Sequence, residues 1–100
     1  MGAITGTLAT KTEFGGDYAL FKITCTPAAA SDTVTLTLAD HGIRTILGVI
    51  PQLIAGQDAN LAFIFASFSG LVITLTTYEE DMTVATDWTG ASAVLWVIAK

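Results

Sequence analysis

Alternation of apolar and polar residues is the most regular pattern along this chain. In residues 18–26, one set of alternate positions is apolar throughout and consists of Ala19, Phe21, Ile23 and Cys25. Because successive side chains of a strand point to opposite faces of a sheet, this period of two predicts a half-buried β-strand. Pro27 should end the strand, since proline has no amide hydrogen and a fixed φ.

Residues 33–39 show the same alternation more clearly. Three aliphatic residues alternate with three threonines, namely Val34, Leu36 and Leu38 with Thr33, Thr35 and Thr37. This pattern predicts a strand whose aliphatic face meets the core and whose hydroxyl-coated face lies outside. The Asp-His-Gly sequence at residues 40–42 then predicts a turn.

The rest of the chain consists of short apolar segments separated by turn residues. We expect strands at residues 61–67, 71–78, 82–87 and 91–99. Residues 43–50 fit either a strand or one short turn of helix that ends at Pro51, and residues 52–60 are then a loop. Strands punctuated by turns about every 8–12 residues are typical of sandwiches and barrels. The sequence therefore predicts an all-β fold, a single β-sandwich or jelly-roll-like domain of about six to eight short strands.

The N-terminal segment differs from the remainder. Residues 1–16 are rich in Gly, Thr and Ala, and Ile4 and Leu8 are the large aliphatic residues before Phe14. A segment with so little apolar bulk buries little surface by itself. We assign residues 1–16 to an N-terminal arm or edge strand and residues 17–100 to the β-sandwich domain. We expect the arm to contact a partner and the domain to fold without it.

Charge is scarce in this chain. Only 13% of its residues are charged and 52% are hydrophobic, whereas about 25% charged is usual. A small domain of this composition must expose apolar or hydroxyl-rich surface, and large exposed apolar patches mark partner surfaces. The net charge of −5 and the four scattered basic residues argue against a nucleic-acid partner and against an anionic membrane surface.

Residues 59–78 carry no charge and are long enough to cross a bilayer as a helix. Both flanks are acidic, Ser-Phe-Ser-Gly interrupts the stretch at residues 67–70, and residues 71–76 are rich in β-branched side chains. These features favour two strands joined by a turn.

Candidate catalytic groups are few. His41 is the only histidine, no serine lies in a nucleophile motif, and we expect His41 to be a turn residue with local hydrogen bonds. Cys25, the only cysteine, is expected to be a buried strand residue. The acidic run at residues 79–81 fits a solvated hairpin loop, and one His with one Cys makes a poor zinc site. We therefore expect no enzymatic activity, no catalytic residues, no metal and no cofactor.

Two tryptophans leave an alternative open. Trp88 precedes Thr89-Gly90 and is expected to be exposed at a turn, whereas Trp96 lies in an apolar strand of the core or a subunit interface. Exposed aromatic rings can stack on sugars. A small carbohydrate-binding or adhesion β-sandwich is therefore the alternative to a protein-packing role.

The stretch DTVTLTLADHGIRTILGV at residues 32–49 resembles a segment of small virion proteins of tailed bacteriophages, typically encoded near the major capsid protein. In those proteins a Thr-rich strand runs into a Gly-Ile turn and a short Ile/Leu segment. The resemblance implies a capsid decoration or cement protein on the capsid surface of the virion, with the major capsid protein as its partner. Another head or tail component is a variant of this hypothesis.

Self-association is expected as well, because the chain is apolar and nearly uncharged and virion proteins act through repeated contacts. A homo-oligomer is predicted, and a trimer is its expected form. The residues expected at interfaces are those of the arm, of the threonine face and of the late turn: Ile4, Leu8, Phe14, Thr33, Thr35, Thr37 and Trp88.

Overall fold

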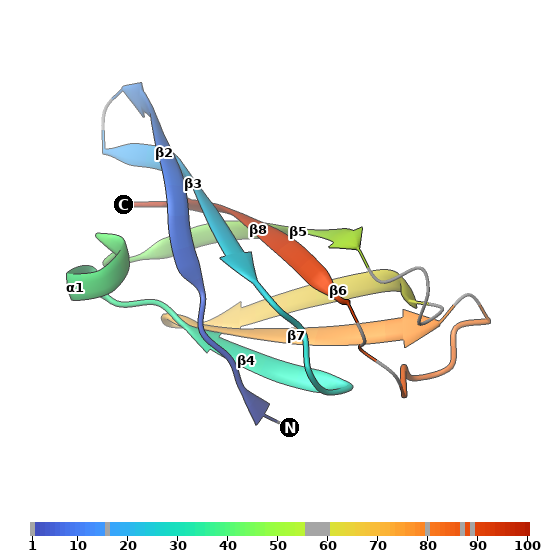
Figure 1. Cartoon of the computed structure of the whole chain (residues 1–100). Helices are drawn as coiled ribbons and strands as arrows, with labels where there is room; N and C mark the ends of the chain where they lie inside the picture. Colours follow the sequence, from blue (N-terminus) through green and yellow to red (C-terminus); the bar gives the residue numbers. More distant parts are fainter. Residues whose placement is uncertain (1, 16, 56–60, 80, 87, 89) are drawn as a thin grey trace.

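Two β-sheets pack face to face in the computed structural model, which describes residues 2–15, 17–55, 61–79, 81–86, 88 and 90–100 (Figure 1). Sheet A has the strand order β1-β4-β7-β6 and comprises β1 (Gly2–Ala3), β4 (Ser31–Thr35), β7 (Val72–Glu79) and β6 (Leu61–Ser69). Sheet B has the order β2-β3-β8-β5 and comprises β2 (Thr7–Gly15), β3 (Tyr18–Cys25), β8 (Ser92–Ala99) and β5 (Ile46–Ala55).

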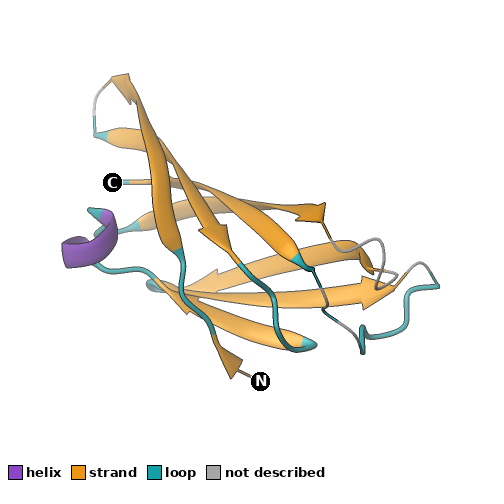
Figure 2. Cartoon of the chain, viewed as in Figure 1, coloured by secondary structure: helices purple, strands orange, loops and turns teal. Residues whose placement is uncertain are grey.

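Strands dominate the described residues, and the helix α1 (Leu38–His41) is a single turn between β4 and β5 (Figure 2). All the strand pairs are antiparallel except β1 with β4. The predicted all-β, sandwich-like fold is confirmed. No helix among the described residues is long and apolar enough to cross a membrane, and residues 61–79 instead form the β6–β7 hairpin.

The core lies between the facing sides of the two sheets. β3 contributes the apolar alternate residues that its sequence pattern predicts, and each of them is buried: Ala19, Phe21, Ile23 and Cys25. Opposite them, Val34 of β4 and Ile73 and Leu75 of β7 are buried in the same cluster. β8 completes the cluster with every second residue, namely Ala93, Leu95, Val97 and Ala99.

The strand predicted at residues 33–39 is shorter than its pattern indicates. β4 ends at Thr35, and Leu38 begins α1 with 52% of its surface exposed. Thr37 is the N-cap of the helix, because its Oγ1 accepts a hydrogen bond of 3.0 Å from the backbone N–H of Asp40. The predicted core position of Leu38 and the predicted outward strand position of Thr37 are therefore wrong, whereas Leu36 is fully buried.

His41 is buried and connects two distant segments. Its Nδ1 accepts a hydrogen bond of 3.0 Å from the N–H of Thr37, and its Nε2 lies 2.6 Å from the carbonyl oxygen of Gly6. Because Nδ1 accepts, Nε2 carries the proton and donates to Gly6. The expected local hydrogen bond is present, and the bond to Gly6, which was not expected, also connects α1 to the N-terminal segment.

The N-terminal segment passes from sheet A to sheet B and packs against the core. Ile4 and Leu8 contact the core cluster, and Gly6 between them is buried. A Cβ atom on Gly6 would lie only 2.6 Å from Val34 Cγ1 and 2.8 Å from Ile23 Cγ2. Residues 7–15 form β2, the edge strand of sheet B. Because this segment closes one side of the sandwich, we now expect its removal to destabilise the domain.

Pro51 does not end a strand. β5 continues through it to Ala55, so the loop predicted at residues 52–60 begins no earlier than residue 56, and residues 56–60 lie outside the described part. β5 is an edge strand that pairs only with β8 among the described residues, and proline is tolerated where its missing N–H faces away from the neighbouring strand.

The strand predicted at residues 82–87 is not formed. Its described residues contribute only an isolated bridge between Val84 and Tyr78, and residue 87 is outside the described part. Met82 has a positive φ of 66°, which interrupts any extended run. Thr83 instead donates hydrogen bonds to the Asp81 carboxylate through both its N–H and its hydroxyl.

Candidate protein-binding face

The outer side of sheet B carries an apolar surface, here called the Trp96 face and defined by Leu20, Ile50, Val94, Trp96 and Ile98. β8 supplies its centre, since Val94, Trp96 and Ile98 alternate with the buried core residues of the same strand. Ile50 of β5 lies directly opposite Trp96, and Leu20 of β3 lies opposite Ile98. Directly paired residues of antiparallel strands project to the same side, so the five side chains form one surface.

Trp96 is held in place by two polar neighbours. Its Nε1 donates a hydrogen bond of 3.0 Å to Gln52 Oε1 on β5. The Lys22 Nζ of β3 lies 5.7 Å from the centroid of the indole ring, a cation–π arrangement. Contacts from both sides restrict the ring, so Trp96 would lose little conformational freedom when a partner covers it.

The Trp96 face remains accessible. Ile50 is 61% exposed, Leu20, Trp96 and Ile98 are half-buried, and Val94 at the edge of the face is buried. The border of this apolar centre on the β2 side is rich in hydroxyl groups and consists of Thr7, Thr10, Thr12 and Thr24. An apolar centre with an aromatic residue and a polar border is the usual anatomy of a protein–protein interface.

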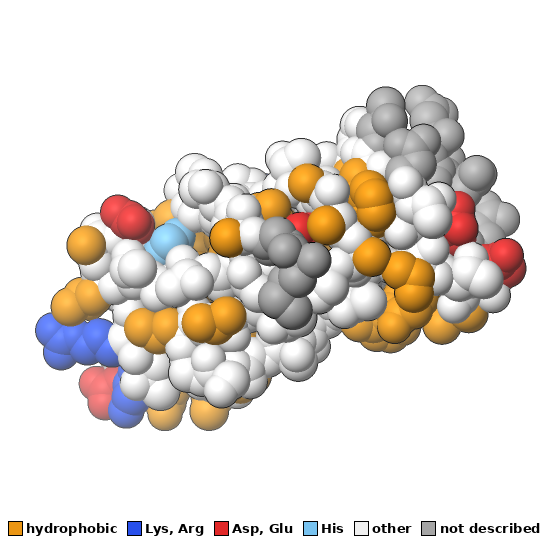
Figure 3. Space-filling model, turned by 90° about the horizontal axis from the view of Figure 1, so that it is seen from below, with side chains coloured by type: hydrophobic (Ala, Val, Ile, Leu, Met, Phe, Trp, Pro, Cys, Tyr) orange, Lys and Arg blue, Asp and Glu red, His pale blue; other side chains and the backbone are white. Residues whose placement is uncertain are grey.

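The outer side of sheet A is different in character. Figure 3 views the molecule from this side, with Lys and Arg gathered at one end together with some acidic side chains, and hydrophobic side chains beside further acidic residues at the other. Its middle is hydroxyl-rich, because Thr33 pairs with Thr74 and Thr74 pairs with Ser67. Toward the acidic end, the rings of Phe65 and Tyr78 meet edge to face with centroids 5.4 Å apart.

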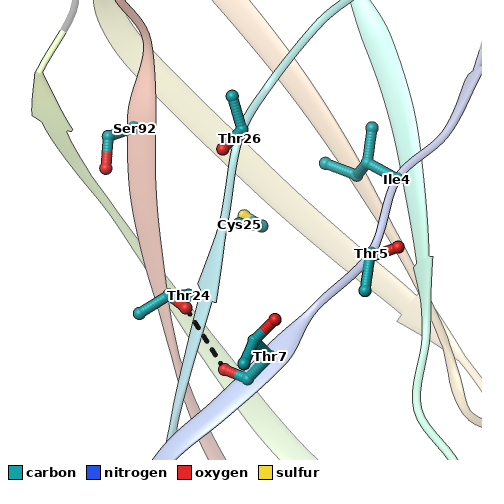
Figure 4. A pocket seen from close by; sticks show the side chains of 7 residues that line it. All are labelled: Ile4, Thr5, Thr7, Thr24, Cys25, Thr26 and Ser92. Atoms are coloured by element: carbon teal, nitrogen blue, oxygen red, sulfur yellow. Dashed lines mark hydrogen bonds between the residues drawn. The ribbon is translucent and has the colours of Figure 1, made fainter.

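A hollow between the N-terminal segment and the end of β3 is one candidate for small-molecule chemistry (Figure 4). Hydroxyl and aliphatic side chains surround Cys25 there, and Thr24 Oγ1 donates a hydrogen bond of 3.3 Å to the Thr7 carbonyl. Its lining residues are Ile4, Thr5, Thr7, Thr24, Cys25, Thr26 and Ser92, and they include no acid and no base. Burial, and then the negative charge of Asp32, raise the pKa of the Cys25 thiol to about 11. The thiol is protonated at neutral pH and is not a nucleophile.

Two carboxylates, those of Asp32 and Asp81, accept hydrogen bonds from nearby residues of the chain. Asp32 is buried, and its Oδ2 accepts hydrogen bonds of 3.0 and 3.1 Å from the N–H groups of Ala28 and Ala29. Donation from Thr83 lowers the pKa of Asp81, which lies exposed in the loop after β7. Among the described residues, no three His, Cys, Asp or Glu side chains are grouped so that they could hold a metal ion.

The residues expected at interfaces are dispersed. Ile4 and Leu8 pack inward, Thr33 and Thr35 lie on sheet A, and Thr37 caps α1. Phe14 belongs to β2, but its side chain lies outside the described part of the structure.

Trp88 is not the exposed turn residue that its sequence context predicts. It is half-buried, packs against the cluster of Leu61, Ala85 and Ala91, and donates a hydrogen bond of 2.9 Å from Nε1 to Thr77 Oγ1.

The interface residues predicted from the sequence do not include Leu20, Ile50 or Ile98, although the sequence contains a signal for the outer side of β8. Residues 92–99 are apolar at nearly every position, so both sides of that strand are apolar. One side of a strand in a two-layer sandwich faces outward. An apolar outer side of this strand, in addition to its core-facing side, therefore indicates a surface that contacts a partner.

Comparison of the chain with protein-family models, curated proteins and solved structures finds no match.

Proposed function

We propose that this chain is a non-enzymatic structural protein that binds other protein subunits through the Trp96 face. The observation that supports the proposal most directly is the exposed apolar outer side of sheet B, with Trp96 fixed at its centre by Gln52 and Lys22. Leaving such a surface in water is unfavourable by roughly 25 cal/mol per Å² of apolar area, and a partner removes that cost.

The resemblance of residues 32–49 to small phage virion proteins suggests which partner this is. We propose a capsid decoration or cement protein, for which the partner is a lattice of major capsid protein at the virion surface. A lattice presents many identical sites, so an oligomer of this chain that engages several of them would gain affinity through avidity.

The carbohydrate-binding alternative receives less support. Trp88 is half-buried and bonded to Thr77, while Trp96 lies on the outer side of sheet B. The two rings therefore do not form one stacking platform.

Co-sedimentation with empty capsids tests the proposal, with the capsids assembled from a major capsid protein of the genome that encodes this chain. The test variant is Ile50→Lys, which places a charge next to Trp96 at a position that is 61% exposed in the free domain. Desolvating an unpaired lysine in an apolar interface is costly, so the variant should fold normally and bind at least about tenfold more weakly, a change of about 1.4 kcal/mol.

Thr35→Lys is the matched control, because Thr35 is exposed on the outer side of sheet A. It should bind like the unchanged protein. Loss of binding with Thr35→Lys alone would move the interface to the threonine-rich side of sheet A. Normal binding by both variants, or no sedimentation of the unchanged protein, would refute the proposal.

A further inference from the structure

β6 is the outermost strand of sheet A, and no strand pairs with its free edge among the described residues. Its sequence, LAFIFASFS, contains neither a charge nor a proline. An exposed strand edge presents unpaired N–H and C=O groups to any other strand that can reach them. Proteins usually protect such edges with charges, prolines or bulges.

The other long edge strands of this domain carry that protection. β2 contains Lys11 and Glu13 and has two register irregularities in its pairing with β3. β5 contains Pro51 and also has two irregularities. β6 has one irregularity, between Leu61 and Phe63, and pairs regularly with β7 from Phe63 to Ser69. Among these three strands, β6 alone contains neither a charged residue nor a proline, and it has the fewest irregularities.

Neither side of β6 is fully covered. Phe63 and Phe65 project outward and are 41% and 50% exposed. Phe68 lies on the opposite, core-facing side, yet it is 41% exposed as well. β5 lies beside β6 in the other layer, yet the core-facing ring of Phe68 remains partly open to solvent. β6 thus combines a free backbone edge with exposed aromatic side chains on both sides.

We propose that the occupant of this edge is a second copy of the chain, with the two β6 strands paired antiparallel about a two-fold axis. Such pairing would join the two A sheets into one continuous sheet. Each copy supplies the same uncharged edge, so the interface is isologous. Main-chain hydrogen bonds would provide much of the affinity, as in other cases of strand addition.

The distribution of charge supports the antiparallel orientation. Glu79 lies opposite Leu61 at the start of β6, and Asp81 follows shortly after Glu79. In an antiparallel pair, the Leu61 end of one strand meets the Ser69 end of the other. The acidic loops of the two copies then lie at opposite ends of the interface. A parallel pair would place them side by side, where like charges repel.

The size of the apolar surface sets the expected strength. The exposed fractions of 41%, 50% and 41% for Phe63, Phe65 and Phe68 correspond to on the order of 250 Å² per copy, given about 200 Å² for a whole Phe side chain. A standard interface buries about 800 Å² per partner, so backbone and flanking residues must contribute the remainder. We therefore expect a dimer that dissociates in the micromolar range.

Sedimentation velocity between about 1 and 100 µM tests the proposal, since a micromolar Kd changes the populations within that range. The unchanged protein should shift from monomer to dimer. Ser67→Lys adds a charge at an exposed position of β6, and it should remain monomeric at every concentration. Thr10→Lys adds the same charge at an exposed position of the β2 edge, and it should dimerise normally.

Phe65→Thr provides a second variant that does not depend on an added charge. Threonine retains a high strand propensity, so the fold should persist while the dimer weakens at least about tenfold. Thermal unfolding at low concentration verifies that each variant is folded. Ile50→Lys, on the other sheet, should dimerise normally, which separates this inference from the proposed function.

A monomer at 100 µM, a trimer, or a dimer that survives both Ser67→Lys and Phe65→Thr would each overturn the proposal. Dimerisation that is lost with Thr10→Lys would overturn it too, because the contact would then lie at the β2 edge.

Discussion

Substitution of Gly6 by alanine tests how the N-terminal segment closes the sandwich. The added Cβ would lie 2.6 Å from Val34 Cγ1 and 2.8 Å from Ile23 Cγ2, distances that real Cβ atoms essentially never show. Both neighbours are stiff β-branched side chains in the fully buried core, so they cannot rotate away easily. The clash must be relieved by moving the segment that carries Gly6, whose carbonyl also accepts the hydrogen bond from His41.

The expected cost follows from comparable changes. Extra methylenes forced into a packed core cost about 1–3 kcal/mol. For a domain of this size, about 2 kcal/mol lowers the melting temperature by roughly 8–16 °C. Circular dichroism during thermal unfolding measures the shift directly. Gly48→Ala is the matched control, because a Cβ at Gly48 meets no atom within 4 Å, and it should change stability by less than about 1 kcal/mol.

A second substitution, at Val34, measures how much of the destabilisation comes from the contact between residues 6 and 34. Val34→Ala removes the atom that the new Cβ would strike, so Gly6→Ala and Val34→Ala should be less harmful together than the sum of their separate effects. The difference is the interaction energy of a double-mutant cycle, of about 0.5–3 kcal/mol for residues in contact. If Gly6→Ala melts within about 2 °C of the unchanged protein, a shift of well under 1 kcal/mol, residues 4–8 are not packed as described.

Further predictions follow from the corrected path of the chain. Leu36→Ala should destabilise the domain by about 2–5 kcal/mol in urea unfolding. Leu38→Ala changes an exposed position and should cost less than about 1 kcal/mol. Equal losses of stability for the two variants would show that Leu38 is buried in the core. Thr37→Ala should cost about 0.5–2 kcal/mol through the lost N-cap, and Thr37→Ser should retain most of the stability. Cys25 should resist thiol reagents in the native state at neutral pH and react in denaturant. Because its pKa is about 11 in the fold against an ordinary 9.0, the unfolded thiol ionises first. Stability should therefore be insensitive to this group below about pH 9 and fall between about pH 9 and 11, as urea unfolding across that range would show.

The elements that the sequence predicts well are those with a one-sided pattern. β3 has apolar residues at alternate positions and mostly polar or amphipathic ones between them, so only one register buries its apolar side. Residues 33–39 continue such a pattern beyond the end of the strand. There the Thr37 hydroxyl bonds to the Asp40 N–H, and Gly42 adopts a left-handed φ of 72°. The hydrogen bonds that cap the helix decide the conformation of this segment, and the alternation of apolar and polar residues does not reveal them.

Other features depend on neighbours that the sequence does not reveal. Pro51 is compatible with β5 because that strand lies at an edge, and edge position is a property of the sheet. His41 is hydrogen-bonded to Gly6, which lies 35 residues earlier in the sequence, and no local motif predicts this contact. The Trp96 face is similar, since Leu20, Ile50 and Trp96 become neighbours only through the register of three strands.

The most direct test of the central claim is the fluorescence of Trp96 in the presence of capsids. Trp88→Phe leaves Trp96 as the only tryptophan of the chain, and its half-buried indole reports whether the Trp96 face is covered. With capsids added, the emission should shift to shorter wavelength and become protected from acrylamide quenching, as expected for a ring transferred from water into a protein interface. Capsid binding that leaves both the emission and the quenching of Trp96 unchanged would contradict the account, because the partner would then occupy another surface.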